Sequence, residues 1–151
     1  YINISEKYNF ANERKSSFLK SLKLNKINFN PNYYASVKLE EPENSFEVIK
    51  KMLTKNKKIS AIICSTEFSA LSAIKACNYL NYKIGKDISI ITFDGALVRD
   101  LSSPPITAVS FPVKELGKRA INILLDKNKN QTVNYLAKSE IIERGSVHIV
   151  N

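Results

Sequence analysis

The sequence predicts an α/β fold with a mainly parallel sheet flanked by helices. Short runs of β-branched and apolar residues alternate with longer segments whose apolar residues recur at helical spacing. Two of the runs, 59–64 and 88–93, are almost continuously apolar, which is typical of parallel strands that are covered on both faces. This alternation of strand and helix along the chain favours a layered α/β architecture.

The first part of the chain contains two strands and two helices. The expected elements are a strand at 1–4, a helix over 9–23, a break at 30–32, an alternating strand over 34–39 and a helix over 45–55. Asn44 or Ser45 is expected to cap the second helix, because both side chains can accept a backbone hydrogen bond.

The second part continues the same alternation. The expected elements are a strand at 59–64, a helix over 67–81, a strand at 88–93, a loop over 94–105, an extended run at 106–111, a helix from Pro112, a turn at 126–131 and one or two strands within 132–150. Gly85 suits the left-handed residue that follows the helix over 67–81. Pro112 fits the first turn of the last helix.

Length and charge limit the possible functions. The 151 residues suffice for one domain with a real core, and no apolar run is long enough to span a bilayer. Although the net charge is +9, the lysines are spread along the chain. The densest run, within 50–58, lies where a helix should end and where cations favour the helix dipole. We therefore do not expect this segment to bind DNA or a membrane.

The sequence predicts neither a metal centre nor a bound cofactor. Cys64 and Cys77 lie in apolar patterns and match no zinc spacing, and His148 has no potential ligands around it. The four glycines cannot form a phosphate-binding loop of the Rossmann or P-loop type. Free cysteines and the lack of a secretory leader favour a cytoplasmic location, although a chain that begins at Tyr1 is expected to have lost upstream residues.

Candidate binding residues follow the strands, because ligands of open α/β sheets bind beyond the carboxyl ends of the strands. These candidates are Ser5, Thr66, Glu67, Asp94 and Phe111. A carboxylate pair formed by Glu67 and Asp94 could serve hydrolysis, but nothing else in the chain supports an enzyme.

Two charged side chains each have two possible roles. The Asp94 carboxylate could accept hydrogen bonds from ligand hydroxyls, or it could cap the loop that begins at Gly95. The Arg14 guanidinium could grip vicinal hydroxyls or a carboxylate, or it could pair on the surface with Glu13 or a neighbour. Position alone does not decide between these roles.

An ordered set of motifs resembles a known family. The motifs are ISAIICSTEFSALSAI at 59–74, DISIITFDG at 87–95, PPITAV at 104–109, ELG at 115–117 and, upstream, NERKSSF at 12–18. In this order they resemble the effector-binding core of the LacI/GalR family of transcription regulators. The resemblance covers nearly the whole chain.

This resemblance implies a periplasmic-binding-protein-like type I lobe, which is Rossmann-like and incomplete here. In the family, two lobes close on a small molecule, often a sugar or a purine, and signal to an N-terminal helix-turn-helix. By this comparison, residues 1–151 are an effector-binding and dimerisation fragment without the helix-turn-helix. Residues 1–110 would form the C-terminal lobe, 111–138 would pack on the other lobe, and 139–151 would add a C-terminal strand.

The resemblance also assigns roles to single residues. Arg14 stands where the family has an effector-gripping arginine, and Asp94 where it has a hydroxyl-accepting aspartate. The pair Thr66 and Glu67 replaces the usual Asn-Asp, and Phe111 replaces a common glutamine. The phenylalanine would add an apolar wall, so the effector would be less polar than a free hexose, or the pocket would be rearranged.

Apolar side chains on the expected surface indicate contacts with other chains or lobes. Dimerisation in the family uses the helix after Thr66 and the loop after Asp94, which here carry Phe68, Leu71 and Leu97. The last helix would expose an apolar face if its partner lobe is missing. That face consists of Val113, Leu116 and Ala120.

We therefore expect the ligand-sensing and dimerising part of a LacI-type transcriptional repressor. It would bind a sugar-like or nucleobase effector, form a homodimer, and contact operator DNA only through a missing N-terminal domain. The alternative is a sugar solute-binding protein of a transporter, which has the same fold and a signal peptide. A different DNA-binding head, such as a winged helix, is a third possibility.

Overall fold

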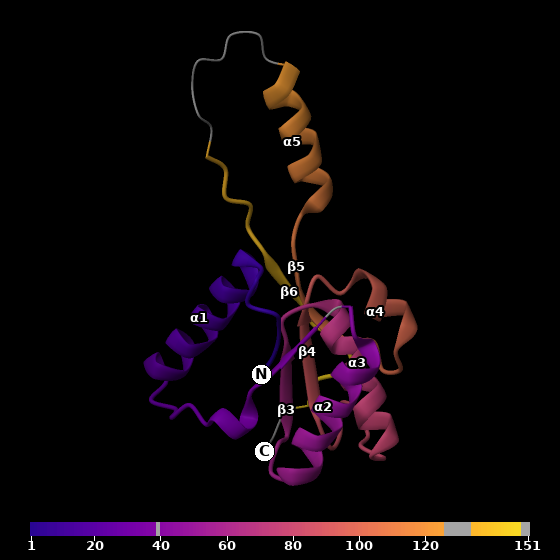
Figure 1. Cartoon of the computed structure of the whole chain (residues 1–151). Helices are drawn as coiled ribbons and strands as arrows, with labels where there is room; N and C mark the ends of the chain where they lie inside the picture. The colour runs from indigo at the N-terminus through magenta and orange to yellow at the C-terminus, as the bar shows by residue number, and fades with distance from the viewer. Residues whose placement is uncertain (39, 126–133, 149–151) are drawn as a thin grey trace.

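Six strands form one sheet in the order β2-β1-β3-β4-β5-β6 in the computed structural model (Figure 1). The strands are β1 (Ile2–Ile4), β2 (Ala35–Val37), β3 (Ala61–Cys64), β4 (Ser89–Phe93), β5 (Thr107–Ser110) and β6 (Glu140–Ile142). All neighbours are parallel except β5 and β6, which are antiparallel. The structure describes residues 1–38, 40–125 and 134–148, without the side chains of Leu97 and Asp100. The expected mainly parallel α/β sheet is confirmed.

The direction of each crossover decides which face a helix covers. The helices are α1 (Asn9–Leu24), α2 (Pro42–Lys55), α3 (Glu67–Tyr79), α4 (Ala96–Leu101) and α5 (Val113–Leu125), with a 3₁₀ turn, η1, at Pro31–Tyr33. The connection from β1 to β2 moves across the sheet in one direction. The connections from β2 to β3, β3 to β4 and β4 to β5 move in the opposite direction. Because such crossovers are right-handed, α1 lies on one side of the sheet and α2, α3 and α4 lie on the other (Figure 1).

The core lies between the sheet and the three helices on one side. Fully buried side chains there include Ile49 and Leu53 of α2 and Ile90 of β4. The expectation that the central strands are covered on both faces was wrong for the described residues. Ala61 is exposed and Ile63 is only half-buried, because α1 is the single described helix on that side and covers only part of it.

Several local expectations also need correction. The cap of α2 is Glu41 with Pro42 at the first helical position, so Ser45 lies inside the first turn, where its hydroxyl donates to the Lys38 and Glu41 carbonyls. Asn81, with φ of 60°, takes the left-handed position after α3. Gly85 is also left-handed, but it lies in a later turn.

Two other segments differ from their expected form. The expected loop over 94–105 contains the short helix α4, which buries Val98 completely. The described part of the C-terminal tail holds one short strand, β6, whereas the turn expected at 126–131 lies outside the described residues.

Helix α5 leaves the sheet together with the segment that returns to β6 (Figure 1). None of its described residues is buried, and Val113 and Leu124 are 70% and 80% exposed. Leu116 and Ala120 are exposed as well, so the expected apolar face on this helix is confirmed.

The two cysteines lie in the core, as expected. Cys64 ends β3 and Cys77 lies in α3, and both are free thiols. Burial raises the pKa of each thiol to about 12.

Candidate functional site

A hollow of about 300 Å³ opens at the carboxyl edge of the sheet. It lies near the switch point between β1 and β3, where crossovers leave in opposite directions and ligands of such sheets bind. Its lining residues are Phe10, Arg14, Thr66, Glu67, Phe68 and Asp94. Four residues expected at an effector site therefore lie around one hollow, and their role in binding stays a prediction.

Arg14 is half-buried among aromatic rings. Its Nη1 donates to the carbonyl oxygen of Ser65, directly after β3. Its Cζ lies 4.4 Å from the ring centre of Phe93 and 5.0 Å from that of Phe10. Burial lowers the pKa of Arg14, and the nearby Asp94 charge acts in the opposite direction. Among the ion pairs of the described residues none joins Arg14 to Glu13, so the surface-pair alternative is not what the structure contains.

Two of the aromatic neighbours were missed from the sequence. Phe10 precedes Arg14 by four residues on α1, a spacing that places both on one helix face. Phe93 is the last residue of β4, one position before the candidates that follow strands. Phe111 stacks on Phe93 at 6.5 Å with nearly parallel planes and lies 5.8 Å from the Arg14 Cζ. It backs the aromatic wall without lining the hollow itself.

Asp94 occupies an unusual backbone conformation. Its φ is 73° and that of Gly95 is 85°, so two successive left-handed residues connect β4 to α4. The Asp94 amide donates to the Val109 carbonyl of β5 at 2.9 Å. The side chain is exposed at the rim of the hollow.

Thr66 has a structural role that was missed from the sequence. Its hydroxyl accepts from the Ser69 amide at 3.2 Å, and the Ser69 hydroxyl accepts from the Thr66 amide at 3.1 Å. This capping box begins α3 and satisfies two backbone donors that a helix start leaves open. Glu67 lies partly buried in the first turn, where a negative charge favours the helix dipole.

The remaining expected residues lie at or beyond the margin of the hollow. Ser5 is half-buried after β1, does not line the hollow, and accepts from the Tyr8 amide through its carbonyl at 3.4 Å. Phe68 is 56% exposed and also lines a smaller hollow between α2 and α3 together with Leu71. Leu97 belongs to α4, but its side chain lies outside the described residues.

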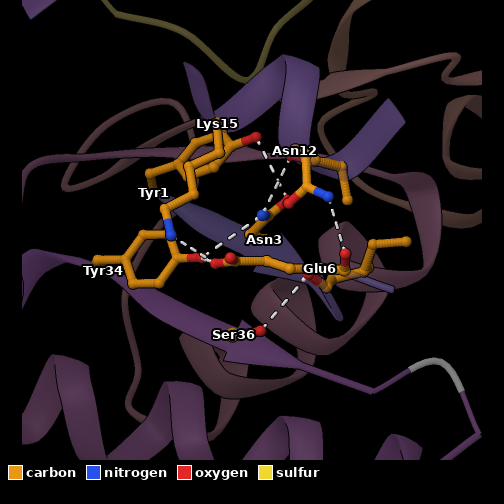
Figure 2. Close-up of polar contacts among 9 residues, drawn as sticks. Tyr1, Asn3, Glu6, Asn12, Lys15, Tyr34 and Ser36 are labelled. Carbon is orange, nitrogen blue, oxygen red and sulfur yellow. Dashed lines mark hydrogen bonds and ion pairs between the residues drawn. The ribbon is translucent and has the colours of Figure 1, made fainter. Parts of the chain in front are cut away.

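A polar network, also missed from the sequence, fixes α1 and hence Arg14 against the sheet (Figure 2). The buried Asn3 of β1 donates through Nδ2 to the Ala11 carbonyl at 3.3 Å and to the Tyr34 hydroxyl at 3.4 Å. Glu6 accepts from the Tyr34 hydroxyl at 2.9 Å and from Lys15, the neighbour of Arg14. The hydrogen bonds from Lys15 and Tyr34 lower the pKa of Glu6.

Neither a metal site nor a membrane span emerges from the part of the chain that the structure describes. Within 1–38, 40–125 and 134–148, no three His, Cys, Asp or Glu side chains are placed to hold a metal ion. None of the helices in those ranges combines the length and the apolar character needed to cross a bilayer.

Known proteins match this chain over nearly all of its length. A family model described as periplasmic binding protein-like domain matches residues 2–147. The HTH-type transcriptional repressor PurR of Haemophilus influenzae is 30% identical over 133 residues, which are 87% of this chain and 39% of that protein. The HTH-type transcriptional regulator RegA of Clostridium saccharobutylicum is 32% identical over 117 residues, 76% of this chain and 34% of its own.

Solved structures show the same fold. A sugar-binding transcriptional regulator of the LacI family from Escherichia coli, in complex with phosphate, aligns with a TM-score of 0.82 and 22% identity. The alignment covers 97% of this chain and 54% of that structure. The chain thus spans about two fifths of the curated relatives it matches, and about half of this solved chain.

Proposed function

Because the chain belongs to the periplasmic binding protein-like domain family, in the form found in LacI/GalR regulators, we propose that it senses a small effector for a transcriptional repressor. The effector is sugar-like or a nucleobase, and it controls DNA binding by a separate N-terminal helix-turn-helix. Relatives named as transcriptional regulators favour this proposal over a transporter's solute-binding protein. They also favour a binding role without catalysis, in the cytoplasm.

The observation that carries the proposal is the combination of groups around the hollow. A guanidinium held on an aromatic wall can stack on or hydrogen-bond a planar or hydroxylated ligand, and Asp94 can accept hydrogen bonds from it. Phe10 and Phe68 add apolar contact area at the rim. Such a mixture of apolar walls and few polar groups is typical of small-molecule sites.

The hollow is open, so a second lobe would have to complete it. We propose that residues 1–110 form the C-terminal lobe, that 111–138 pack on the other lobe, and that 139–151 add a C-terminal strand. The exposed apolar face of α5 supports this division, because large exposed apolar patches usually mark an interface. Effector binding would then shift the lobes toward closure and alter the DNA-binding state.

We also propose that the chain forms a homodimer through Phe68, Leu71 and Leu97. The exposed Phe68 ring next to a small apolar hollow supports this assignment. Sedimentation velocity at high protein concentration should show a dimer that Phe68→Glu converts to monomer. A clean monomer of the unaltered chain at high concentration contradicts this part of the proposal.

Calorimetric titration with purine bases and free monosaccharides tests the effector site. We expect a member of one class to bind with Kd no tighter than about 0.1 mM, because half of the enclosing site is missing. Asp94→Asn should weaken this binding at least tenfold. Asp87→Asn serves as the matched control, since Asp87 accepts from the Lys83 amide in a turn away from the hollow.

Two outcomes would count against the proposal. Binding by this chain alone that is clearly tighter than about 0.1 mM contradicts the two-lobed clamp. Binding that is unchanged in Asp94→Asn contradicts the assigned site. Reading the coding sequence upstream of the Tyr1 codon separates the two function classes. A helix-turn-helix there supports the regulator, whereas a signal peptide supports solute capture for a transporter.

A further inference from the structure

Arg144 connects the C-terminal segment to the turn that carries Asp94. It lies two residues after β6, and its Nη1 donates to the carbonyl oxygens of Gly95, at 3.4 Å, and Ile106. Gly95 is 49 residues away in the sequence and directly follows Asp94. A single guanidinium therefore bridges the turn after β4 and the start of β5.

The turn needs such a contact because its conformation is unfavourable for one of its residues. Asp94 is a non-glycine residue with φ of 73°, which costs about 1 kcal/mol relative to ordinary backbone. Such a conformation persists only where surrounding contacts hold it. The amide of Asp94 is held by the Val109 carbonyl, and Arg144 holds the carbonyl of the next residue.

Packing around Gly95 is tight on the side that faces β5 and Arg144. A Cβ atom at Gly95 would lie 2.3 Å from the Ala108 Cβ and 3.2 Å from the Arg144 Nη1. The turn is thus pressed against β5 and the guanidinium at once. Since the carboxylate of Asp94 leaves the same turn, its place at the hollow depends on where this turn lies.

Arg144 is itself firmly anchored. Its amide donates to the Thr107 hydroxyl at 3.0 Å, and that hydroxyl donates to the Arg144 carbonyl at 3.3 Å. Two residues later, the buried Ser146 hydroxyl donates to the Ile90 carbonyl at 2.6 Å and accepts from the Thr107 amide at 2.8 Å. The backbone around Arg144 is therefore fixed to β4 and β5, the strands before and after the turn.

We infer that Arg144 is a positioning residue that holds the Asp94–Gly95 turn so that the Asp94 carboxylate stays at the hollow beside Arg14. This inference rests on the proposed function, in which Asp94 contacts the effector. Arginine suits the task because the two hydrogens of Nη1 can reach acceptors on two segments while the guanidinium plane fixes their directions. A lysine ammonium is a compact point charge on a flexible stem. Arg144 acts through Asp94 and does not itself line the hollow.

Amide NMR of the whole chain tests the inference without a ligand. In Arg144→Met and in the milder Arg144→Lys, the amide signals of residues 94–96 should move and their hydrogen exchange should accelerate about tenfold, with Lys intermediate. Exchange at Ile91 in β4 should stay as in the unaltered chain. Arg119→Met is the control, because Arg119 stacks on Tyr135 away from the turn.

The outcomes separate this inference from the proposed function. Unchanged signals at 94–96 overturn the inference, and so does an equal loss of protection across β4 and β5, which indicates general support of the sheet. If the purine and monosaccharide panel gives no binding to the unaltered chain, the proposed ligand classes fail while the NMR result still decides about Arg144. If a panel member binds, Arg144→Met should weaken it about tenfold and Arg119→Met should not.

Discussion

The guanidinium carbon of Arg14 lies 4.4 Å from the centre of the Phe93 ring, while Nη1 of the same side chain donates to the Ser65 carbonyl. Phe93 ends β4 and Ser65 follows β3, so one side chain from α1 spans the ends of two neighbouring strands. Stacking holds the plane of the guanidinium while the hydrogen bond fixes one of its edges. In the proposed function, this arrangement orients Arg14 before the effector arrives, which would lower the entropic cost of binding.

Arg14→Lys should separate binding from stability. The lysine keeps the charge but loses the planar fork and the stacking, so we expect a stability loss of about 1 kcal/mol in urea unfolding. The affinity for any compound that binds the chain should fall more than tenfold. Arg119→Lys is the matched control, because Arg119 also stacks on a ring, 4.0 Å from the centre of Tyr135. Equal loss of affinity in both variants would contradict a specific role for Arg14.

Thr66 should tolerate any side chain that can cap α3. Thr66→Ala removes the acceptor for the Ser69 amide, so we expect a loss of about 1 kcal/mol in urea unfolding. Thr66→Ser and Thr66→Asn keep an acceptor and should stay within about 0.5 kcal/mol of the unaltered chain. A large loss in Thr66→Asn would show that the methyl group or the size of the residue matters more than the cap.

Gly95 and Gly117 should respond oppositely to alanine. At Gly95 the backbone is left-handed and a Cβ would lie 2.3 Å from the Ala108 Cβ, so Gly95→Ala should destabilise by about 2 kcal/mol or more. At Gly117, inside α5, a Cβ meets nothing within 4 Å. Gly117→Ala should therefore stabilise by about 0.5–1 kcal/mol through helix propensity. Chemical denaturation of both variants checks the pair, and a neutral Gly95→Ala would be the contrary result.

The strand pattern explains how much of the site the sequence could predict. Continuous apolar runs located β3 and β4, and the residues that follow strands led to Thr66, Glu67 and Asp94, which the structure gathers around one hollow. Phe93 was missed because it is the last residue of its strand and looks like a core position. Helix α4 was missed because six residues carry too little periodicity. Among its described side chains, Val98 is buried and packs the helix onto the core.

Contacts between distant segments could not be predicted from the sequence. Arg144 reaches Gly95 only because β6 returns antiparallel to β5, and its own neighbours give no sign of that pairing. Asn3 lies between Ile2 and Ile4 in a strand that reads as apolar, yet its amide links α1 to Tyr34 of the neighbouring segment. Such roles depend on tertiary placement, which local spacing does not encode.

The buried thiols should make the fold less stable at alkaline pH. Folding raises the pKa of Cys64 and Cys77 to about 12, whereas both thiols titrate near their ordinary value in the unfolded chain. Between about pH 9 and 12 the unfolded state therefore binds fewer protons, and stability falls by up to about 1.4 kcal/mol per thiol and pH unit. Below that range this contribution is fully present.

Urea unfolding from pH 7 to 10.5 checks this pH dependence. In the double variant Cys64→Ala and Cys77→Ala, the free energy of unfolding should fall less steeply with rising pH, because the contribution of the two thiols is gone. The smaller side chains lower stability at every pH. Ellman's reagent should also react with the native chain only as fast as it unfolds. Rapid labelling of the folded chain at pH 8 would contradict the burial of both thiols.

The exposed face of α5 should act as a binding surface without contributing to the core. Ile121 and Leu124 are 55% and 80% exposed, so Ile121→Lys with Leu124→Lys should change the unfolding free energy by no more than about 0.5 kcal/mol. The same pair of changes should lower binding of a hydrophobic dye, because it breaks up an apolar patch, and should leave the dimer through Phe68 intact. Ile49→Lys is the contrasting variant, since Ile49 is fully buried in α2 and its replacement should unfold the chain. A loss of stability in the α5 double variant as large as that in Ile49→Lys would mean that α5 is packed against the chain in solution. Helix α5 could then not be the proposed contact of 111–138 with a second lobe.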